Sequence, residues 1–126
     1  MKITIESTPH KLQRYPTVGD WYRDANGDLV IKVSQMSDWR FMALVALHEL
    51  VEVLLCDHRG IRQETVDKFD IEFEAHRHPD NFDEPGDDPQ APYKKEHCFA
   101  TGVERLLAAE LGVDWSTYAD EIDSLP

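Results

Sequence analysis

The segment FMALVALHELVEVLL, from Phe41 to Leu55, decides the fold, because twelve of its fifteen residues are apolar. A helix that is apolar on every side is typical of a buried helix. The three polar exceptions are His48, Glu49 and Glu52. At 100° per residue, Glu52 lies about 40° from His48 and Glu49 about 100° from it, so the three share one side of the helix. We therefore expect a buried helix that carries an imidazole and two carboxylates into the core.

The ends of this helix can be predicted from its flanking residues. Ser37 or Asp38 can cap its first turn, and Gly60 is a typical stop, so the helix is expected from Trp39 to Asp57. Apolar repeats at three and four residues, together with capping and breaking residues, predict three more helices. These are Gln63–Arg77, Tyr93–Leu111 and a short last helix, Trp115–Ile122.

The first third of the chain has the pattern of strands. Residues Met1–Glu6 alternate between apolar and polar, and two further extended segments, Trp21–Arg23 and Leu29–Ser34, flank the turn dipeptide Asn26-Gly27. We expect an α+β fold in which a small N-terminal antiparallel sheet packs with three main helices. Residues 1–126 then form a single domain, mainly β over 1–36 and mainly helical over 37–126, with an acidic surface loop at 80–92.

Composition narrows the possible functions. The chain has 126 residues, with 25 acidic against 13 basic side chains and a formal net charge of −12. Binding to nucleic acid or to an anionic membrane needs clustered Lys and Arg, so neither is expected as a partner. The first twenty residues lack the apolar core of a signal peptide, which predicts a cytoplasmic protein with its two cysteines reduced.

The buried acids need a positive partner. Placing two neighbouring carboxylates in a core costs several kcal/mol unless a counter-charge or a metal compensates. His48 and Glu52, four residues apart, can both reach one divalent ion, and Glu49 would then lie beside a water on that ion. A network of ion pairs, for example between Glu52 and Arg105 or Lys94, is the alternative interpretation.

The other helices carry similar misplaced polar residues. Asp70 lies at the edge of the apolar stripe of its predicted helix, and His97 and Glu104 lie seven residues apart on one seam of theirs. We predict His48, Glu52, Asp70 and His97 as ligands of one divalent metal ion. Glu49 is the candidate general base, and Glu104 is expected to fix the tautomer of His97.

An extended segment followed by HELVE on a buried helix resembles the zincin metallopeptidases, whose motif is HExxH. The likeness covers residues 29–57. It implies that His48 is the first metal ligand, that Glu49 is the general base, and that Glu52 stands where the family has its second histidine. A carboxylate at that position makes the site harder, so manganese, iron or magnesium become alternatives to zinc. The expected activity is that of a metal-dependent hydrolase acting on a peptide or small-molecule substrate.

Two other resemblances compete with this one. Glu49 and Glu52 form an ExxE motif and Asp67 and Asp70 a DxxD motif, which is similar to the MazG-type nucleotide pyrophosphohydrolases. The whole chain also resembles small uncharacterised phage and prophage proteins, which leaves a non-catalytic phage interaction protein as a further hypothesis.

Overall fold

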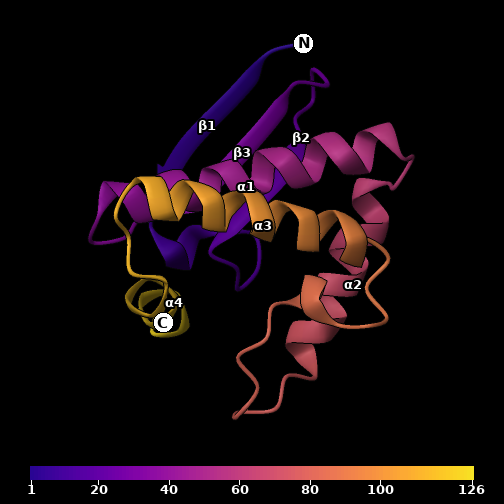
Figure 1. Cartoon of the computed structure of the whole chain (residues 1–126). Helices are drawn as coiled ribbons and strands as arrows, with labels where there is room; N and C mark the ends of the chain where they lie inside the picture. Colours follow the sequence, from indigo (N-terminus) through magenta and orange to yellow (C-terminus); the bar gives the residue numbers. More distant parts are fainter.

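A computed structural model describes all 126 residues of the chain and confirms the α+β class (Figure 1). Three strands come first: β1 (Ile3–Thr8), β2 (Gly19–Arg23) and β3 (Leu29–Ser34). They are followed by the helices α1 (Trp39–His58), α2 (Gln63–Ala75), α3 (Lys94–Glu110) and α4 (Trp115–Asp123). Two short 3₁₀ turns, η1 (His10–Leu12) and η2 (Pro85–Asp87), lie in the connections.

The sheet is mixed, with strand order β1-β3-β2. β2 and β3 form the expected antiparallel hairpin, with Trp21 opposite Ile31. β1 instead runs parallel to β3, with Ile5 also opposite Ile31. The segment between β1 and β2 carries the chain across to the far edge, and the hairpin then returns β3 to the middle. An alternating sequence specifies a strand but not its neighbour, so this parallel pairing could not be predicted.

Helix α1 lies between the sheet and α3 and packs against both (Figure 1). Leu44 and Val53 of α1 are fully buried, as are Leu29 and Ile31 of β3. One apolar residue of α1, Leu54, is half exposed to solvent. The helix also does not reach the outer strand of the sheet, where Ile3 and Ile5 of β1 are half exposed. The central helix is therefore largely rather than wholly buried.

The helix ends lie within two residues of their predicted positions. The Asp38 carboxylate accepts a hydrogen bond from the Arg40 amide, as expected for a cap of α1. The Asp114 carboxylate caps α4 in a similar way by accepting a hydrogen bond from the Thr117 amide. The stretch between α2 and α3 is the irregular loop that the sequence predicts. No helix combines the length and the apolar character needed to cross a membrane.

Candidate metal centre

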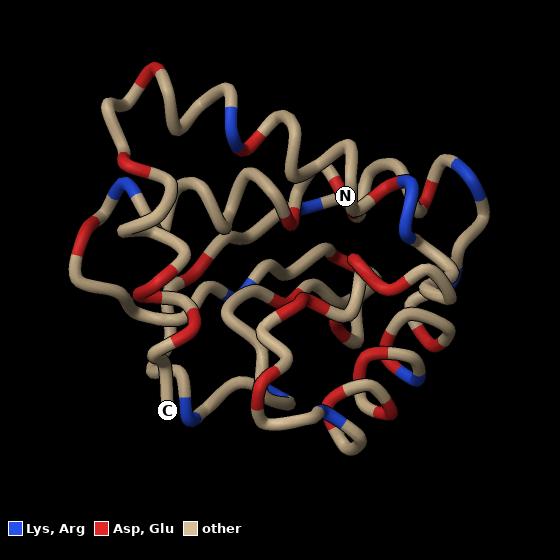
Figure 2. Tube along the Cα trace, turned by 60° about the horizontal axis from the view of Figure 1, so that its bottom comes forward, with Lys and Arg blue, Asp and Glu red and all other residues tan.

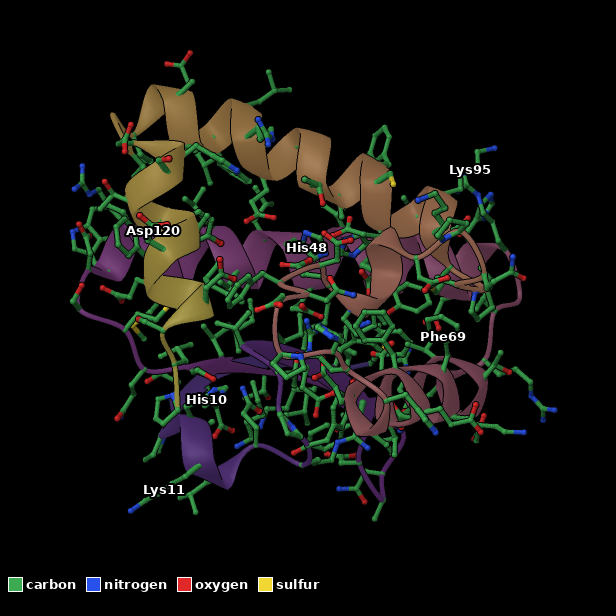
Figure 3. The ribbon with its side chains drawn as sticks, turned by 90° about the horizontal axis from the view of Figure 1, so that it is seen from below. His10, Lys11, His48, Phe69, Lys95 and Asp120 are labelled. Carbon is green, nitrogen blue, oxygen red and sulfur yellow. The ribbon has the colours of Figure 1, made fainter.

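The site forms where α1 and α3 pack side by side in opposite directions (Figure 1). Because the two helices run antiparallel, residues later in α1 contact residues earlier in α3. His48 therefore contacts Glu104 while Glu52 contacts His97. All four side chains are buried. Figure 3 shows His48 near the centre of the molecule, between the two helices and the sheet.

Three atoms of this group meet in a small triangle. Nε2 of His48 lies 3.1 Å from Oε2 of Glu52 and 3.1 Å from Nδ1 of His97. Nδ1 of His97 lies 3.0 Å from the same Glu52 oxygen. Ligand atoms around a tetrahedral zinc ion, each at about 2.1 Å, lie about 3.4 Å from one another. The triangle is thus close to the size that a small divalent ion requires.

Each imidazole meets carboxylates at its other nitrogen. Nδ1 of His48 lies 2.8 Å from Oε1 of Glu104. Nε2 of His97 lies 3.1 Å from Oε2 of Glu84 and 3.2 Å from Oδ1 of Asp87. A neutral imidazole has one N–H, and these carboxylates, as acceptors, draw it to the outer nitrogen. The inner nitrogens then present lone pairs toward Glu52.

The positions of these nitrogen and oxygen atoms favour a cation between them. Three lone-pair donors within 3.1 Å of one another repel unless something positive lies among them. No Lys or Arg side chain bonds to His48, Glu52 or His97, so the alternative pairing of Glu52 with Arg105 or Lys94 does not form. The remaining candidates are a metal ion and a bound proton.

The pKa values indicate that, without an ion, the two imidazoles take up protons and carry this positive charge themselves. Burial alone would lower the pKa of His48, but hydrogen bonds with Glu104 and Glu52 outweigh it and raise the pKa to about 11. The pKa of His97 rises in the same way, against burial, through Asp87, Glu52 and Glu84. Burial would raise the pKa of Glu52, yet the two imidazoles lower it to about 2. Glu52 is therefore an ionised carboxylate at neutral pH, as a metal ligand must be.

Glu52 is held in place by its second oxygen. The indole Nε1 of Trp21, on β2, donates a hydrogen bond of 3.1 Å to Oε1 of Glu52. Oε2 is then the oxygen left to face the imidazoles. The sequence indicates Trp21 only as the first residue of a strand. A buried indole N–H usually needs an acceptor, and that need is the signal by which this contact could be found.

Glu49 lies beside this group but bonds to nothing in the protein. Its carboxylate lines the central cavity and packs against β2, where a side chain at Gly19 would come within 2.6 Å of Oε1. Desolvation, and then the charge of Glu52, raise the pKa of Glu49 well above its usual value. A carboxylate without protein partners and with a raised pKa fits the expected role of general base.

Asp70 is not part of the triangle. It faces the same cavity, but its two oxygens accept hydrogen bonds from the hydroxyls of Tyr15, at 3.0 Å, and Tyr93. Neither tyrosine was singled out from the sequence. Of the four predicted ligands, the structure thus brings together His48, Glu52 and His97. Asp70 is hydrogen-bonded to the two tyrosine hydroxyls instead.

Glu104 lies near the site as predicted, but it holds His48 rather than His97. Two residues seven apart on one helix are separated by about 10.5 Å along its axis, too far for a direct hydrogen bond. The partners of His97 come instead from the acidic loop, through Glu84 and Asp87. Loop residues carry no periodic signal, so this contribution was not visible in the sequence.

The three residues of the triangle, together with Glu49, Asp70 and Glu104, line one cavity of about 340 Å³ that opens between the sheet, α2, α4 and the acidic loop. Its volume suits a small ligand of one or two amino-acid units. Comparison of the chain with known protein families, with curated proteins and with solved structures finds no match. The function must therefore be inferred from the chemistry of the cavity.

Proposed function

We propose that this protein is a metal-dependent hydrolase whose divalent ion is held by His48, Glu52 and His97. The observation that carries the proposal is the triangle of two imidazole nitrogens and one carboxylate oxygen, 3.0–3.1 Å apart, with carboxylates behind both rings. Two histidines and one glutamate also form the ligand set of several zinc hydrolases, which leave a coordination position open.

The chain supplies the other parts that hydrolysis needs. An ion in the triangle would act as a Lewis acid toward a carbonyl or phosphoryl group of the substrate. Glu49, free of protein partners, can accept the proton of the attacking water and deliver it to the leaving group. Trp21, Glu104 and the acidic loop hold the three ligating side chains in one orientation.

Zinc is our first candidate for the ion, since the donor set has two neutral nitrogens and one carboxylate. The same set with open positions also suits iron(II), and manganese or magnesium would be favoured by further oxygen ligands. The protein is placed in the cytoplasm in this proposal, where its free thiols stay reduced.

The MazG-type alternative finds less support. That family is all-helical, whereas this chain has a sheet in its first third. Asp67 of the DxxD motif is engaged by Arg14 at 3.1 Å, and Asp70 is engaged by the two tyrosines. All four acids of the two motifs line the cavity, but both acids of the second motif are engaged by other side chains.

The test is metal content and hydrolysis measured together. Protein purified without chelators or affinity metals should contain about one equivalent of metal by elemental analysis, and His48→Ala should contain almost none. His58→Ala is the matched control, because His58 lies exposed at the end of the same helix. Glu49→Gln should keep the metal yet lose cleavage of a peptide library by about 10²-fold or more.

Two outcomes would count against the proposal. Equal metal content in wild type and His48→Ala would show that no metal binds at the proposed site. Metal in the wild type without any cleavage above the Glu49→Gln level would leave a binding protein instead, in agreement with the non-catalytic hypothesis.

A further inference from the structure

The outer face of α3 carries large apolar side chains that nothing in the fold covers. This helix packs on α1 from the side away from the sheet, and Figure 3 shows it along the upper border of the molecule. Phe99 is 59% exposed there and Leu106 is 71% exposed. The two residues are seven apart, so they point in nearly the same direction, two turns from each other. Single exposed apolar residues are common, but a row of them on one face indicates a binding surface.

These two residues belong to a regular stripe. His97 and Glu104 of the metal centre lie on the opposite face of α3, toward α1. Alternating spacings of four and three residues are typical of a helix that packs lengthwise against another helix. The exposed residues with this spacing, which we call the outer stripe, are Lys95, Phe99, Gly102, Leu106 and Ala109. The helix thus has a second packing face, for which the chain itself supplies no partner.

Gly102, in the middle of the outer stripe, has no role within a single chain. A Cβ at this position would meet no atom of the chain within 4 Å. Glycine in the interior of a helix is less stable than alanine, because its backbone loses more freedom on folding. Without a side chain, however, the backbone of a second helix can approach closely at this point. The glycine is thus explained by a partner helix that crosses α3 here.

Opposite charges stand at the two ends of the outer stripe. Lys95 is its first residue, and Figure 3 shows this side chain pointing away from the molecule. Glu110 follows the last residue of the stripe. Both are exposed, and neither forms an ion pair within the chain. A partner helix that runs in the opposite direction can therefore pair with both ends if it carries the same charges.

The stripe is complementary to itself when reversed. Phe99 lies as far before the Gly102–Val103 bond as Leu106 lies after it, and Lys95 and Glu110 are related to this bond in the same way. A two-fold axis at the bond brings Phe99 onto Leu106 of a second copy. It also brings each Lys95 onto Glu110 of the other copy. Self-complementarity of this kind is the property of a symmetric homodimer interface.

The low charge of the stripe also favours a second copy as the partner. The chain has a net charge of −12, and Figure 2 shows acidic positions spread over most of the fold. Two copies repel each other wherever such acids meet. Between Lys95 and Glu110 the outer stripe has no charged residue, so the copies can approach here without that repulsion.

We propose that two copies of this chain form a symmetric dimer through the outer stripes of their α3 helices, which run antiparallel. A single helix pair makes a small interface, so we expect a dissociation constant of about 1–100 µM. The dimer does not depend on the proposed hydrolase, because the stripe and the metal centre lie on opposite faces of the helix.

The first test is the mass of the protein in solution, measured by sedimentation equilibrium over concentrations on both sides of this constant. Wild type should change from one chain to two as its concentration rises. Leu106→Glu should dimerise at least about tenfold more weakly, because it places a charge inside the interface. Ile71→Glu is the matched control: Ile71 is 52% exposed on α2, outside the stripe, so this variant should dimerise as wild type does.

Charge reversal tests the antiparallel register. Lys95→Glu should weaken the dimer about three- to tenfold, since it places two acids side by side. Lys11→Glu makes the same change in net charge on the far side of the molecule from α3 (Figure 3) and should have much less effect. Exchange of both charges, Lys95→Glu/Glu110→Lys, should restore the wild-type affinity.

Gly102→Leu tests the close approach of the two helices. The new side chain enlarges the apolar surface of each chain, yet it should weaken the dimer about tenfold because it holds the helices apart. All of these substitutions are at exposed positions, so the variants should fold like the wild type.

Four results would overturn the proposal. These are a wild type that stays monomeric at every concentration, dimerisation of Leu106→Glu equal to that of wild type, no recovery of affinity in the charge exchange, and tighter association of Gly102→Leu.

Discussion

The two imidazoles of the site are each fixed by acids on the nitrogen that points away from Glu52. Tyr118 donates a hydrogen bond of 2.6 Å to Oε2 of Glu104, which leaves Oε1 of that carboxylate to face His48. Partners of this kind set the tautomer and orientation of a ligating histidine, and their loss costs metal affinity by about 10- to 100-fold. The buried polar residues of α1 and α3 therefore act as a chain of contacts rather than as isolated charges.

Asp70 shows how a buried acid outside the triangle makes stability depend on pH. Burial raises its pKa to about 7 from the usual 3.8, although hydrogen bonds from Tyr93 and Tyr15 oppose the rise. The folded protein thus holds a proton between these pH values that the unfolded chain has released. The stabilisation is fully present below about pH 4 and is lost as the pH rises through about 7.

We therefore expect wild type to lose stability, relative to Asp70→Asn, between pH 4 and pH 8. The difference in the free energy of unfolding should change by about 2–4 kcal/mol across this range, allowing for the small part of Asp70 that reaches solvent. Urea denaturation of the metal-free proteins at several pH values measures it. A difference that stays constant with pH would show that Asp70 is ionised throughout.

Among the elements, the acidic loop contributes most to the site without being regular structure. Asp87 in the 3₁₀ turn η2 and Glu84 just before it both lie against Nε2 of His97. The backbone amide of Glu84 donates a hydrogen bond of 3.1 Å to Oδ2 of Asp87. Gly86 lies between them, packed on the imidazole so closely that a Cβ there would overlap the ring. The loop thus holds the His97 ring like a cradle, and there is no space for a side chain at position 86.

A methyl group at position 86 tests this cradle. In Gly86→Ala the loop or the His97 ring must move, so zinc affinity should fall by about 10- to 100-fold, as for other lost supports of a ligand. Gly102→Ala is the matched control, because Gly102 lies on α3 with open space around it and should bind zinc normally. Competition titration with a zinc chelator gives both affinities. Unchanged zinc binding in Gly86→Ala would show that the loop does not position His97.

At the scale of the whole molecule, periodicity and capping predicted the elements, because apolar residues in α1 and α3 must face a core. The same argument brought His48, Glu52 and His97 together. Periodicity and capping could not predict that β1 pairs in parallel with β3, or that two tyrosines bind Asp70. Those depend on how segments distant in the sequence pack, and for a single strand or loop several packings satisfy the same local pattern.

The whole fold also bears on what zinc should do to stability. The apolar core of β2, β3, α1, α3 and α4 is continuous without any ion, so the metal-free protein should fold. Only the folded state brings His48, Glu52 and His97 together, so zinc at about 100 times its dissociation constant should add about 2.7 kcal/mol. For a domain of this size that corresponds to a rise in Tm of about 10 °C.

Calorimetric melting with and without zinc should show this rise in wild type and almost none in Glu52→Gln. Exposed acids elsewhere could also bind zinc, and an equal rise in Glu52→Gln would place the stabilising ion among them and outside the triangle.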